Sequence, residues 1–238
     1  LGRIDIMVEV GLLARFQANP REGHLEQLFH LFAYLKKYNR SALVFDPTEP
    51  FLDESVFAEC AWKEYYPGAA EAIPPNMPEP RGKAVVMTCF VDADHAGCRL
   101  TRRSHSGVLI FVNRAPIIWY SKRQATVESS TFGSESVAMR VAIDLIEALR
   151  YKLRMMGVPI DGATKVYCDN ESVVKSTTRP ESTLKKKHNA INYHRAREAQ
   201  AAGHIRVAWI EGKENLADVL TKVLVGERRR YLLSRILW

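Results

Sequence analysis

The feature that most constrains the fold is a succession of three short apolar runs followed by a long helical pattern. The runs VVMTCFVDA (85–93), GVLIFV (107–112) and PIIWYS (116–121) have the length and composition of β-strands, and a short turn-like segment separates the last two. From 131 to 156, apolar residues recur at three- and four-residue spacing until Gly157. This part of the chain therefore predicts a three-stranded meander and one long helix.

The rest of the sequence continues with alternating strands and helices. A strand TKVYC (164–168), a short helix after it, a basic helix over 187–203, a strand IRVAWI (205–210) and a last helix from about Asn215 follow in order. Crossover helices must cover the parallel part of such a sheet. The order predicts an α/β fold, in which a mixed five-stranded sheet is flanked by helices.

The N-terminal third has a different character. One clear packing helix is predicted over HLEQLFHLFAYLKKYN (24–39), and seven of the eleven prolines lie between 47 and 80, where neither a helix nor a central strand is expected. We place a domain boundary near Gly82. The predicted parts are residues 1–50, a Pro-rich linker at 51–82, the α/β domain at 83–224 and a C-terminal tail at 225–238.

Composition narrows the class of protein. A net charge of +7 favours polyanionic partners, with nucleic acid as the first expectation. Four cysteines without CxxC spacing predict reduced thiols rather than a zinc site. No segment approaches the length of a membrane span, so no membrane partner is expected. Because the chain begins with Leu1, we expect a fragment of something longer.

Four acidic residues each lie at a strand end or near a helix start, where α/β folds place their sites. Singly, each has an ordinary explanation as a helix N-terminal or turn acid. Together they would repel one another unless divalent cations lay among them, and oxygen-only ligation suits Mg²⁺ or Mn²⁺. Two such ions roughly 3.5 to 4 Å apart can drive phosphodiester hydrolysis. The four are Asp92, Glu135, Asp169 and Asp218.

A fifth acid complicates the first strand. Asp92 and Asp94 point the same way, because side chains alternate along a strand. One of the two is expected to be a turn acid before Gly97.

The acids stand in the order FVDAD, SSTFGSES, YCDN and NLADVLTK, which resembles the ribonuclease H domain at the C-terminal end of copia-type LTR retrotransposon Pol polyproteins. TRRSHSGVLIFVNRAPIIWYSKRQATVESST resembles that family's second and third strands, and KKKHNAINYHRAREAQAAGHIRVAWI its basic helix and fifth strand. The resemblance implies a ribonuclease H-like fold for 83–224. It also implies that 1–50 is the end of the preceding reverse transcriptase, with a thumb- or connection-like helix.

Function follows from the same resemblance. It implies an endonuclease that cleaves the RNA strand of RNA/DNA hybrids during reverse transcription, with two Mg²⁺ ions, for which Mn²⁺ can substitute. The implied catalytic residues and metal ligands are Asp92, Glu135, Asp169 and Asp218. The implied partners are the RNA/DNA hybrid and the rest of the polyprotein, reverse transcriptase and integrase. The implied location is a cytoplasmic virus-like particle, with the nucleus as the second location. No YxDD-like motif appears, so no polymerase activity is expected from this chain alone.

Basic residues supply the expected contacts to the nucleic acid. The densest cationic stretch is LKKKH at 184–188, and a solvated face is the usual explanation of such a run. Beside an acidic metal site, phosphate binding becomes the better interpretation. The predicted nucleic-acid-binding residues are Arg102, Arg103, Asn170, Lys185, Lys186, Lys187, His188 and Arg195.

Departures from the family pattern keep alternatives open. His95 stands where tryptophan is common, FGSES is one residue longer than usual before Glu135, and Glu171 replaces a frequent glutamine. Many ribonucleases H carry a mobile histidine before the last helix, but the loop EGKEN has none. His188 is the candidate to take over the role of that histidine in product release. The main alternative is a degenerate or domesticated domain of the same fold that binds nucleic acid without cutting. A DNA-directed nuclease or recombinase is the third.

Overall fold

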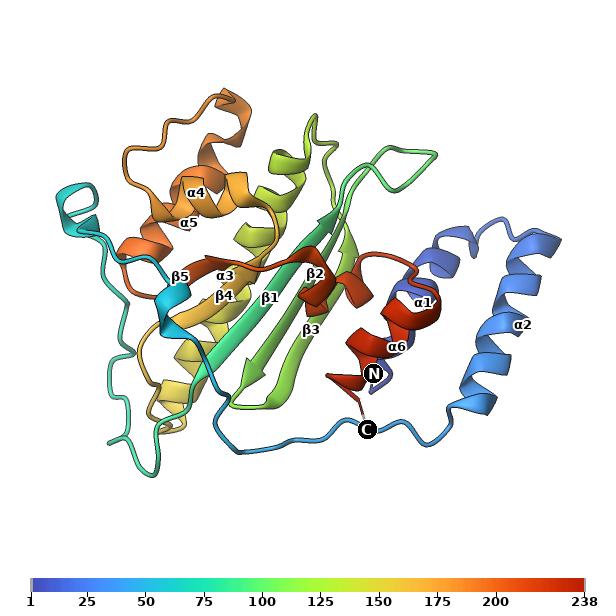
Figure 1. Ribbon diagram of the computed structural model, residues 1–238, viewed down its shortest axis with the longest axis horizontal. Coiled ribbons are helices and arrows are strands. Elements are labelled where there is room, and N and C mark those ends of the chain that lie inside the picture. The colour runs from blue at the N-terminus through green and yellow to red at the C-terminus, as the bar shows by residue number, and fades with distance from the viewer. Residues whose placement is uncertain (1, 238) are drawn as a thin grey trace.

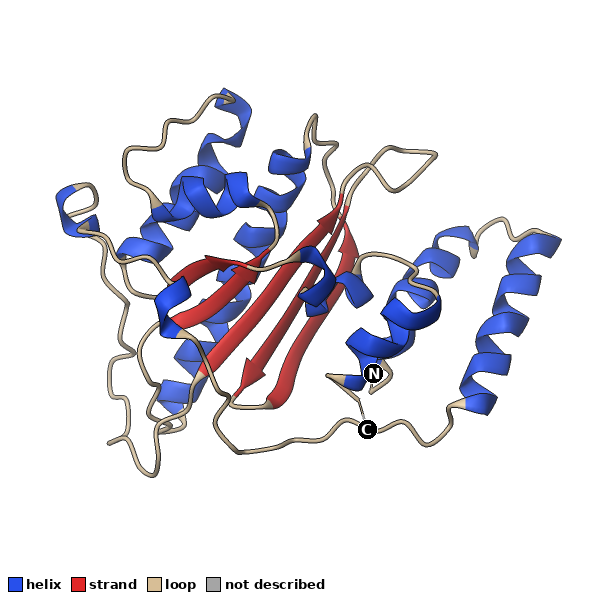
Figure 2. Ribbon diagram, viewed as in Figure 1, coloured by secondary structure: helices blue, strands red, loops and turns tan. Residues whose placement is uncertain are grey.

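The computed structural model describes residues 2–237, and a twisted five-stranded sheet lies at its centre (Figures 1 and 2). The strand order across the sheet is β3-β2-β1-β4-β5. The strands are β1 (Met87–Asp94), β2 (His105–Val112), β3 (Ala115–Arg123), β4 (Thr164–Cys168) and β5 (Ile205–Trp209).

The sheet is mixed in the way that the sequence predicted. β1 pairs antiparallel with β2, which pairs antiparallel with β3, while β4 runs parallel to β1 and β5 parallel to β4. Helices follow β3 and β4, as the parallel strands require. The predicted fold, a mixed five-stranded sheet with flanking helices, is therefore confirmed.

Three helices cover one face of the sheet: α3 (Thr131–Met155), α4 (Glu171–Thr178) and α5 (Ala190–Ala201). The main core lies between them and the strands, where Val91 and Val166 pack with α3 residues such as Ala142 and Ile146. The apolar periodicity predicted for 131–156 is thus the buried stripe of α3. Ser130 caps this helix by accepting a hydrogen bond from the Gly133 amide at 3.2 Å.

Two terminal segments cover the other face. They are the N-terminal segment with α1 (Met7–Leu13) and the C-terminal segment, which contains a 3₁₀ turn (Leu216–Leu220) and α6 (Gly226–Ser234). Ile4 and Leu232 are fully buried here in a second core with Leu109 of β2. The helix expected from Asn215 is therefore only the short 3₁₀ turn. The residues expected to be a tail contain α6.

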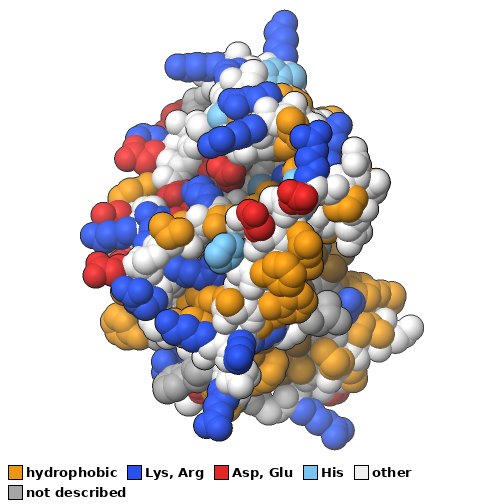
Figure 3. All heavy atoms as spheres, turned by 90° about the vertical axis from the view of Figure 1, so that its right-hand side faces the viewer, with side chains coloured by type: hydrophobic (Ala, Val, Ile, Leu, Met, Phe, Trp, Pro, Cys, Tyr) orange, Lys and Arg blue, Asp and Glu red, His pale blue; other side chains and the backbone are white. Residues whose placement is uncertain are grey.

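Helix α2 (Glu22–Lys37) differs most from expectation. It forms close to the predicted range, but none of its residues, all of which the structure describes, is buried. Phe29 and Phe32 are 61% and 56% exposed. Figure 1 shows α2 standing away from the sheet, and Figure 3 shows apolar side chains gathered on this side of the molecule.

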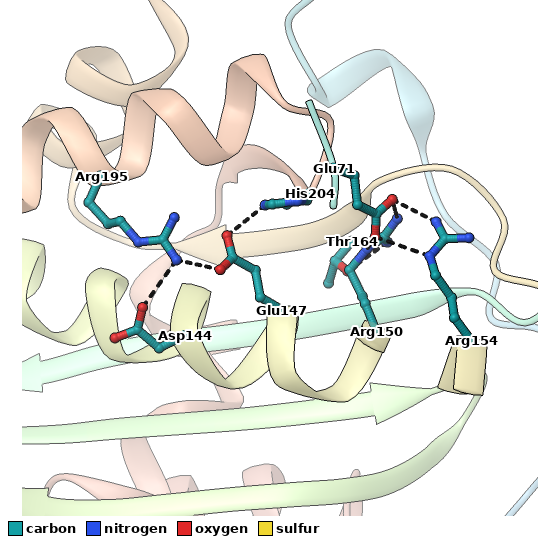
Figure 4. A network of polar contacts seen from close by, with 8 residues as sticks. All are labelled: Glu71, Asp144, Glu147, Arg150, Arg154, Thr164, Arg195 and His204. Carbon is teal, nitrogen blue, oxygen red and sulfur yellow. Dashed lines mark hydrogen bonds and ion pairs between the residues drawn. The ribbon is translucent and has the colours of Figure 1, made fainter. Parts of the chain in front are cut away.

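The Pro-rich segment at 51–82 lies along the body of the protein. Trp62 is buried, and its ring lies 5.1 Å from the Arg197 guanidinium of α5. Glu71 binds Arg150 and Arg154 of α3 (Figure 4). Within 2–237, no helix is long and apolar enough to cross a bilayer. The four cysteines, all within this range, are free.

Candidate metal centre

The four predicted acids meet at the end of the sheet where β1 and β4 finish. Ligand oxygens of Asp92, Asp169 and Asp218 lie within 4.8 Å of one another. An oxygen of Glu135 lies within the same distance of Asp169 and of the Cys168 thiol. Residues separated by up to 126 positions in the sequence (92 to 218) are thus brought into one cluster.

Each acid comes from a different element. Asp92 belongs to β1, Glu135 lies just beyond the first turn of α3, and Asp169 directly follows β4. Asp218 lies in the 3₁₀ turn, and its neighbour Asn215 fixes this turn to the sheet. The Asn215 side chain donates to the Val91 carbonyl at 2.9 Å and accepts from the Ala217 amide at 3.1 Å.

Close packing completes this arrangement. Gly107 of β2 is paired with Asp92 in the strand register. A Cβ atom at Gly107 would lie 2.8 Å from the Ala217 carbonyl and 2.7 Å from the Thr221 methyl. Only glycine lets the 3₁₀ turn approach the sheet so closely, and this approach places Asp218 beside Asp92.

Burial makes the ionised form of these carboxylates unfavourable. Asp92 and Asp218 are each 1% exposed, and Glu135 is 6% exposed. Burial raises the pKa of Asp92 to about 7, although Lys222 opposes the shift. Burial, with the charges of Asp92 and Asp169, holds the pKa of Glu135 well above its usual range. The pKa of Asp169 is also raised, chiefly by burial.

A divalent cation fits this chemistry. One oxygen of Glu135, Oε2, is buried and has no hydrogen-bond partner among the described residues. An orphaned carboxylate oxygen inside a cluster of acids is an unsatisfied acceptor that a hard cation would ligate. Oxygen ligands of this kind suit Mg²⁺ and Mn²⁺, while the neighbouring Cys168 is a buried thiol whose pKa burial raises well above its usual range.

Three residues at the cluster were missed by sequence reasoning. The Lys222 ammonium lies 2.8 Å from Asp218 Oδ1 and 3.2 Å from Asp92 Oδ2. The Thr221 hydroxyl donates to Asp92, and the Arg228 guanidinium of α6 donates to Asp218. The signal for Lys222 was present, because a lysine four residues after an aspartate is an ordinary helical ion-pair spacing.

Asp94 takes no part in this cluster among the described residues. It ends β1 and is half-buried, and its Oδ2 lies so close to Gly97 that a Cβ atom there would be only 1.6 Å away. Its carboxylate thus turns toward the loop after the strand, as expected for a turn acid.

The predicted basic contacts divide into two groups. Lys185, Lys187 and His188 are exposed, as is Arg102, whereas Lys186 and Arg103 are half-buried. Figure 1 shows that their two loops, around 100 and around 185, lie at the end of the sheet where β1 finishes. His188 Nε2 lies 3.9 Å from Glu128, which precedes α3.

The other two predicted contacts are engaged within the protein. Arg195 donates to Glu147 and, at 3.2 Å, to Asp144, both on α3 (Figure 4). The Asn170 side chain caps α4 by accepting from the amides of Ser172 and Val173. Arg195 therefore braces α5 against α3 in this structure.

His95, at a departure from the family pattern, lies beside the metal centre. Its Nδ1 is 3.3 Å from the Ser134 hydroxyl, one residue before Glu135. Helix α3 begins at Thr131, and Glu135 reaches the cluster despite the longer spacing before it.

Comparison with known proteins matches the resemblance seen in the sequence. No family model matches the chain. It is 25% identical, over 93% of its length, to the retrovirus-related Pol polyprotein from transposon RE1 of Arabidopsis thaliana. It is 28% identical, over the same share, to that from transposon TNT 1-94 of Nicotiana tabacum. The chain spans 13% and 14% of these two relatives. The predicted similarity to the Pol polyprotein of a transposon is confirmed.

Among solved structures, the chain is similar to LC11-RNase H1 in complex with RNA/DNA hybrid. The alignment covers 57% of this chain and 93% of that one, with a TM-score of 0.45 and 17% identity.

Proposed function

We propose that this chain carries a metal-dependent ribonuclease H that cleaves the RNA strand of RNA/DNA hybrids during reverse transcription of a transposable element. The observation that carries the proposal is the gathering of Asp92, Glu135, Asp169 and Asp218 at one end of the sheet. Similarity to transposon Pol polyproteins over 93% of the chain supports it.

The four carboxylates would hold divalent cations, with Mg²⁺ as the proposed species and Mn²⁺ as its substitute. Such cations, when bound, supply an activated water and stabilise charge on the departing oxygen. The protein's own contribution is to hold the ligands in place. Asn215 ties the 3₁₀ turn to β1, and the hydroxyl of Thr221 orients Asp92.

The proposed substrate is recognised by shape and charge. Lys185, Lys187 and Arg102 are exposed in loops at the same end of the sheet as the acids. Lysine and arginine at such positions bind phosphates without reading bases. Sensing of 2′-hydroxyls and hybrid geometry would then distinguish an RNA/DNA hybrid from duplex DNA.

The proposed partners rest on the length of the relatives, and the proposed location rests on the resemblance seen in the sequence. Because the chain spans only a small part of each Pol polyprotein, we propose that reverse transcriptase and integrase regions are its companions. The proposed location is a cytoplasmic virus-like particle, with the nucleus as the second location.

A second candidate function has its own support. Both oxygens of Asp218 are engaged by the cationic side chains of Lys222 and Arg228. This pairing favours a domain that binds hybrid without cutting it, because a neutralised carboxylate is a weaker metal ligand.

One assay separates the candidates. The purified chain is incubated with Mg²⁺ and equal amounts of labelled RNA/DNA hybrid, duplex DNA and duplex RNA. We expect cleavage of the RNA strand of the hybrid and of neither duplex. Binding of hybrid without cleavage under Mg²⁺ or Mn²⁺ would establish the second candidate. Cleavage of duplex DNA would point to the DNA-directed nuclease. Primer extension serves as a further control, for which no product is expected.

A further inference from the structure

We propose that the ammonium of Lys222 takes the place of one of the two divalent cations at this centre, so that the chain binds a single divalent ion, held by Glu135 and Asp169. This inference rests on the proposed function and revises the two-ion occupancy that the resemblance implied.

The first support is the position of Lys222. Its Nζ lies 2.8 Å from Asp218 Oδ1, and 3.2 Å and 3.5 Å from the two oxygens of Asp92. A single ammonium therefore bridges two buried carboxylates from different elements. Two buried carboxylates this close together would otherwise need a bound cation to offset their repulsion.

The second support is that other side chains also donate hydrogen bonds to these two carboxylates. Arg228 donates to Asp218 Oδ2, and Thr221 donates to Asp92 Oδ2. Arg228 also donates to the Gly212 carbonyl at 2.9 Å, which keeps its guanidinium against the cluster. A divalent ion on Asp218 would have to displace hydrogen bonds from both cationic side chains or lie beside their charges.

The third support is the contrast with the other half of the cluster. Glu135 and Asp169 form no ion pair with Lys, Arg or His in the part of the chain that the structure describes. Glu135 Oε2 lacks any hydrogen-bond partner there. The uncompensated charge of the centre therefore lies on Glu135 and Asp169, and this is where a divalent ion gains most.

The backbone holds Lys222 in this position. Lys222 follows the 3₁₀ turn, its amide donates to the Asp218 carbonyl at 3.1 Å, and Asn215 fixes the start of the turn to β1. The absence of a side chain at Gly107 lets the turn pack closely against the sheet. The backbone of Lys222 is thus held beside Asp92, within reach of its ammonium.

The test counts bound ions rather than cleavage. Mn²⁺ is titrated into the full chain by calorimetry, and electron paramagnetic resonance distinguishes an isolated ion from a spin-coupled pair. Binding to the double variant Glu135→Gln/Asp169→Asn is subtracted as background. We expect one ion in the parent chain with a mononuclear spectrum. Lys222→Met should raise the count to two and give a coupled spectrum, whereas Lys222→Arg should keep one.

Lys175→Met is the matched control. Lys175 also pairs with an acid four residues earlier, Glu171, but on the exposed surface of α4. Its removal should leave the count at one.

The outcomes separate this inference from the proposed function. Two ions in the parent chain would overturn the inference and leave the proposed function standing. One ion in both the parent and Lys222→Met would overturn the role of Lys222. No ion above background in the parent would overturn both. A parent count of two overturns the inference even if Lys222→Met does not fold.

Discussion

Glu71 binds Arg150 through two hydrogen bonds, from Nε to Oε1 at 2.7 Å and from Nη2 to Oε2 at 2.9 Å (Figure 4). Arg154 donates to the same carboxylate. The Arg150 side chain is only 3% exposed. The contact joins the Pro-rich segment to the last turns of α3, at the opposite end of that helix from Glu135. It is therefore an element of stability that lies apart from the candidate metal centre.

The Glu71 contact predicts a pH-dependent loss of stability in Glu71→Gln. Burial alone would raise the pKa of Glu71, but Arg150 and Arg154 lower it to about 2. Because the folded-state pKa lies below the unfolded value, the stabilisation is complete above the unfolded value of 4.5 and disappears as the pH falls toward 2. We expect Glu71→Gln to lower the free energy of unfolding by about 2 kcal/mol at pH 7.

Urea unfolding at a series of pH values measures this difference. Glu79→Gln, on an exposed residue of the same segment, is the control and should stay close to the parent. An equal loss of stability at pH 7 and near pH 2 would show that the charge of Glu71 is not the cause.

The N-terminal segment is predicted to be part of the folded core. Ile4 is fully buried in the second core with Leu109 and Leu232. Ile4→Ala should cost about 2 to 4 kcal/mol, because it removes buried methylene groups and leaves a cavity. Thermal unfolding measures the effect, with Val10→Ala, at a site 47% exposed, as the control.

The same packing predicts the behaviour of a truncated chain. Residues 83–224 contain all five strands, which favours folding of this piece alone. However, the cut would expose Leu109 and Phe111 by removing Ile4 and Leu232. We expect a soluble fragment only when the second core is kept, and strong binding of an apolar dye by 83–224. A fully stable 83–224 that binds no dye would contradict this.

Asp92 and Asp94 are predicted to differ sharply in their effect on cleavage. Asp92→Asn removes a buried acid of the cluster and should lower Mg²⁺-dependent cleavage by at least about 100-fold. This loss exceeds the one expected for a residue that only hydrogen-bonds to a metal ligand. Asp94→Asn should be much milder, since Asp94 turns toward Gly97.

Hybrid affinity and circular dichroism provide the check for Asp92→Asn. We expect the fold to persist and affinity to hold or rise, because the substitution removes a negative charge near the phosphate. Equal cleavage by Asp92→Asn and the parent would show that Asp92 is not a metal ligand and that another acid holds the ion.

The basic loop is predicted to set the salt dependence of hybrid binding. Neutralising Lys185, Lys186 and Lys187 to Gln should weaken binding to all hybrid sequences alike. The slope of log affinity against log salt should flatten by roughly one unit for each phosphate that the loop no longer binds. Neutralising Lys36 and Lys37 is the control, because both are exposed on α2, a helix that Figure 1 shows on the opposite side of the sheet from this loop. An unchanged slope would show that these lysines do not bind phosphates and that the loop is an ordinary solvated surface.

Local pattern was sufficient to predict the strands, the long helix and the identity of the four clustered acids. Apolar periodicity depends only on which face each residue presents, so it identified β1 and α3 directly from sequence. Asp92 and Asp169 could be recognised because both stand at strand ends, where a parallel sheet gathers side chains. These features depend only on residues that are close together in the sequence, so they can be predicted without the tertiary structure.

Only the tertiary structure decided which charged groups meet. Arg195, predicted as a phosphate contact, binds Asp144 and Glu147 in this structure, while Lys222, whose spacing indicated only a pair with Asp218, bridges Asp92 and Asp218. A charged side chain is compatible with solvent, ligand or ion pair until the fold places a partner within a few ångströms, since the attraction falls off with distance and screening.

The terminal segments show the same limit for apolar residues. Nothing near Ile4 or Leu232 in the sequence distinguishes a tail from a core element. Their burial depends on a contact across the chain from one terminus to the other, on the second face of the sheet. The sequence by itself determined the five strands, α3 and the four acids, whereas the fold alone decided that both termini complete the core and that a lysine lies beside two of the acids.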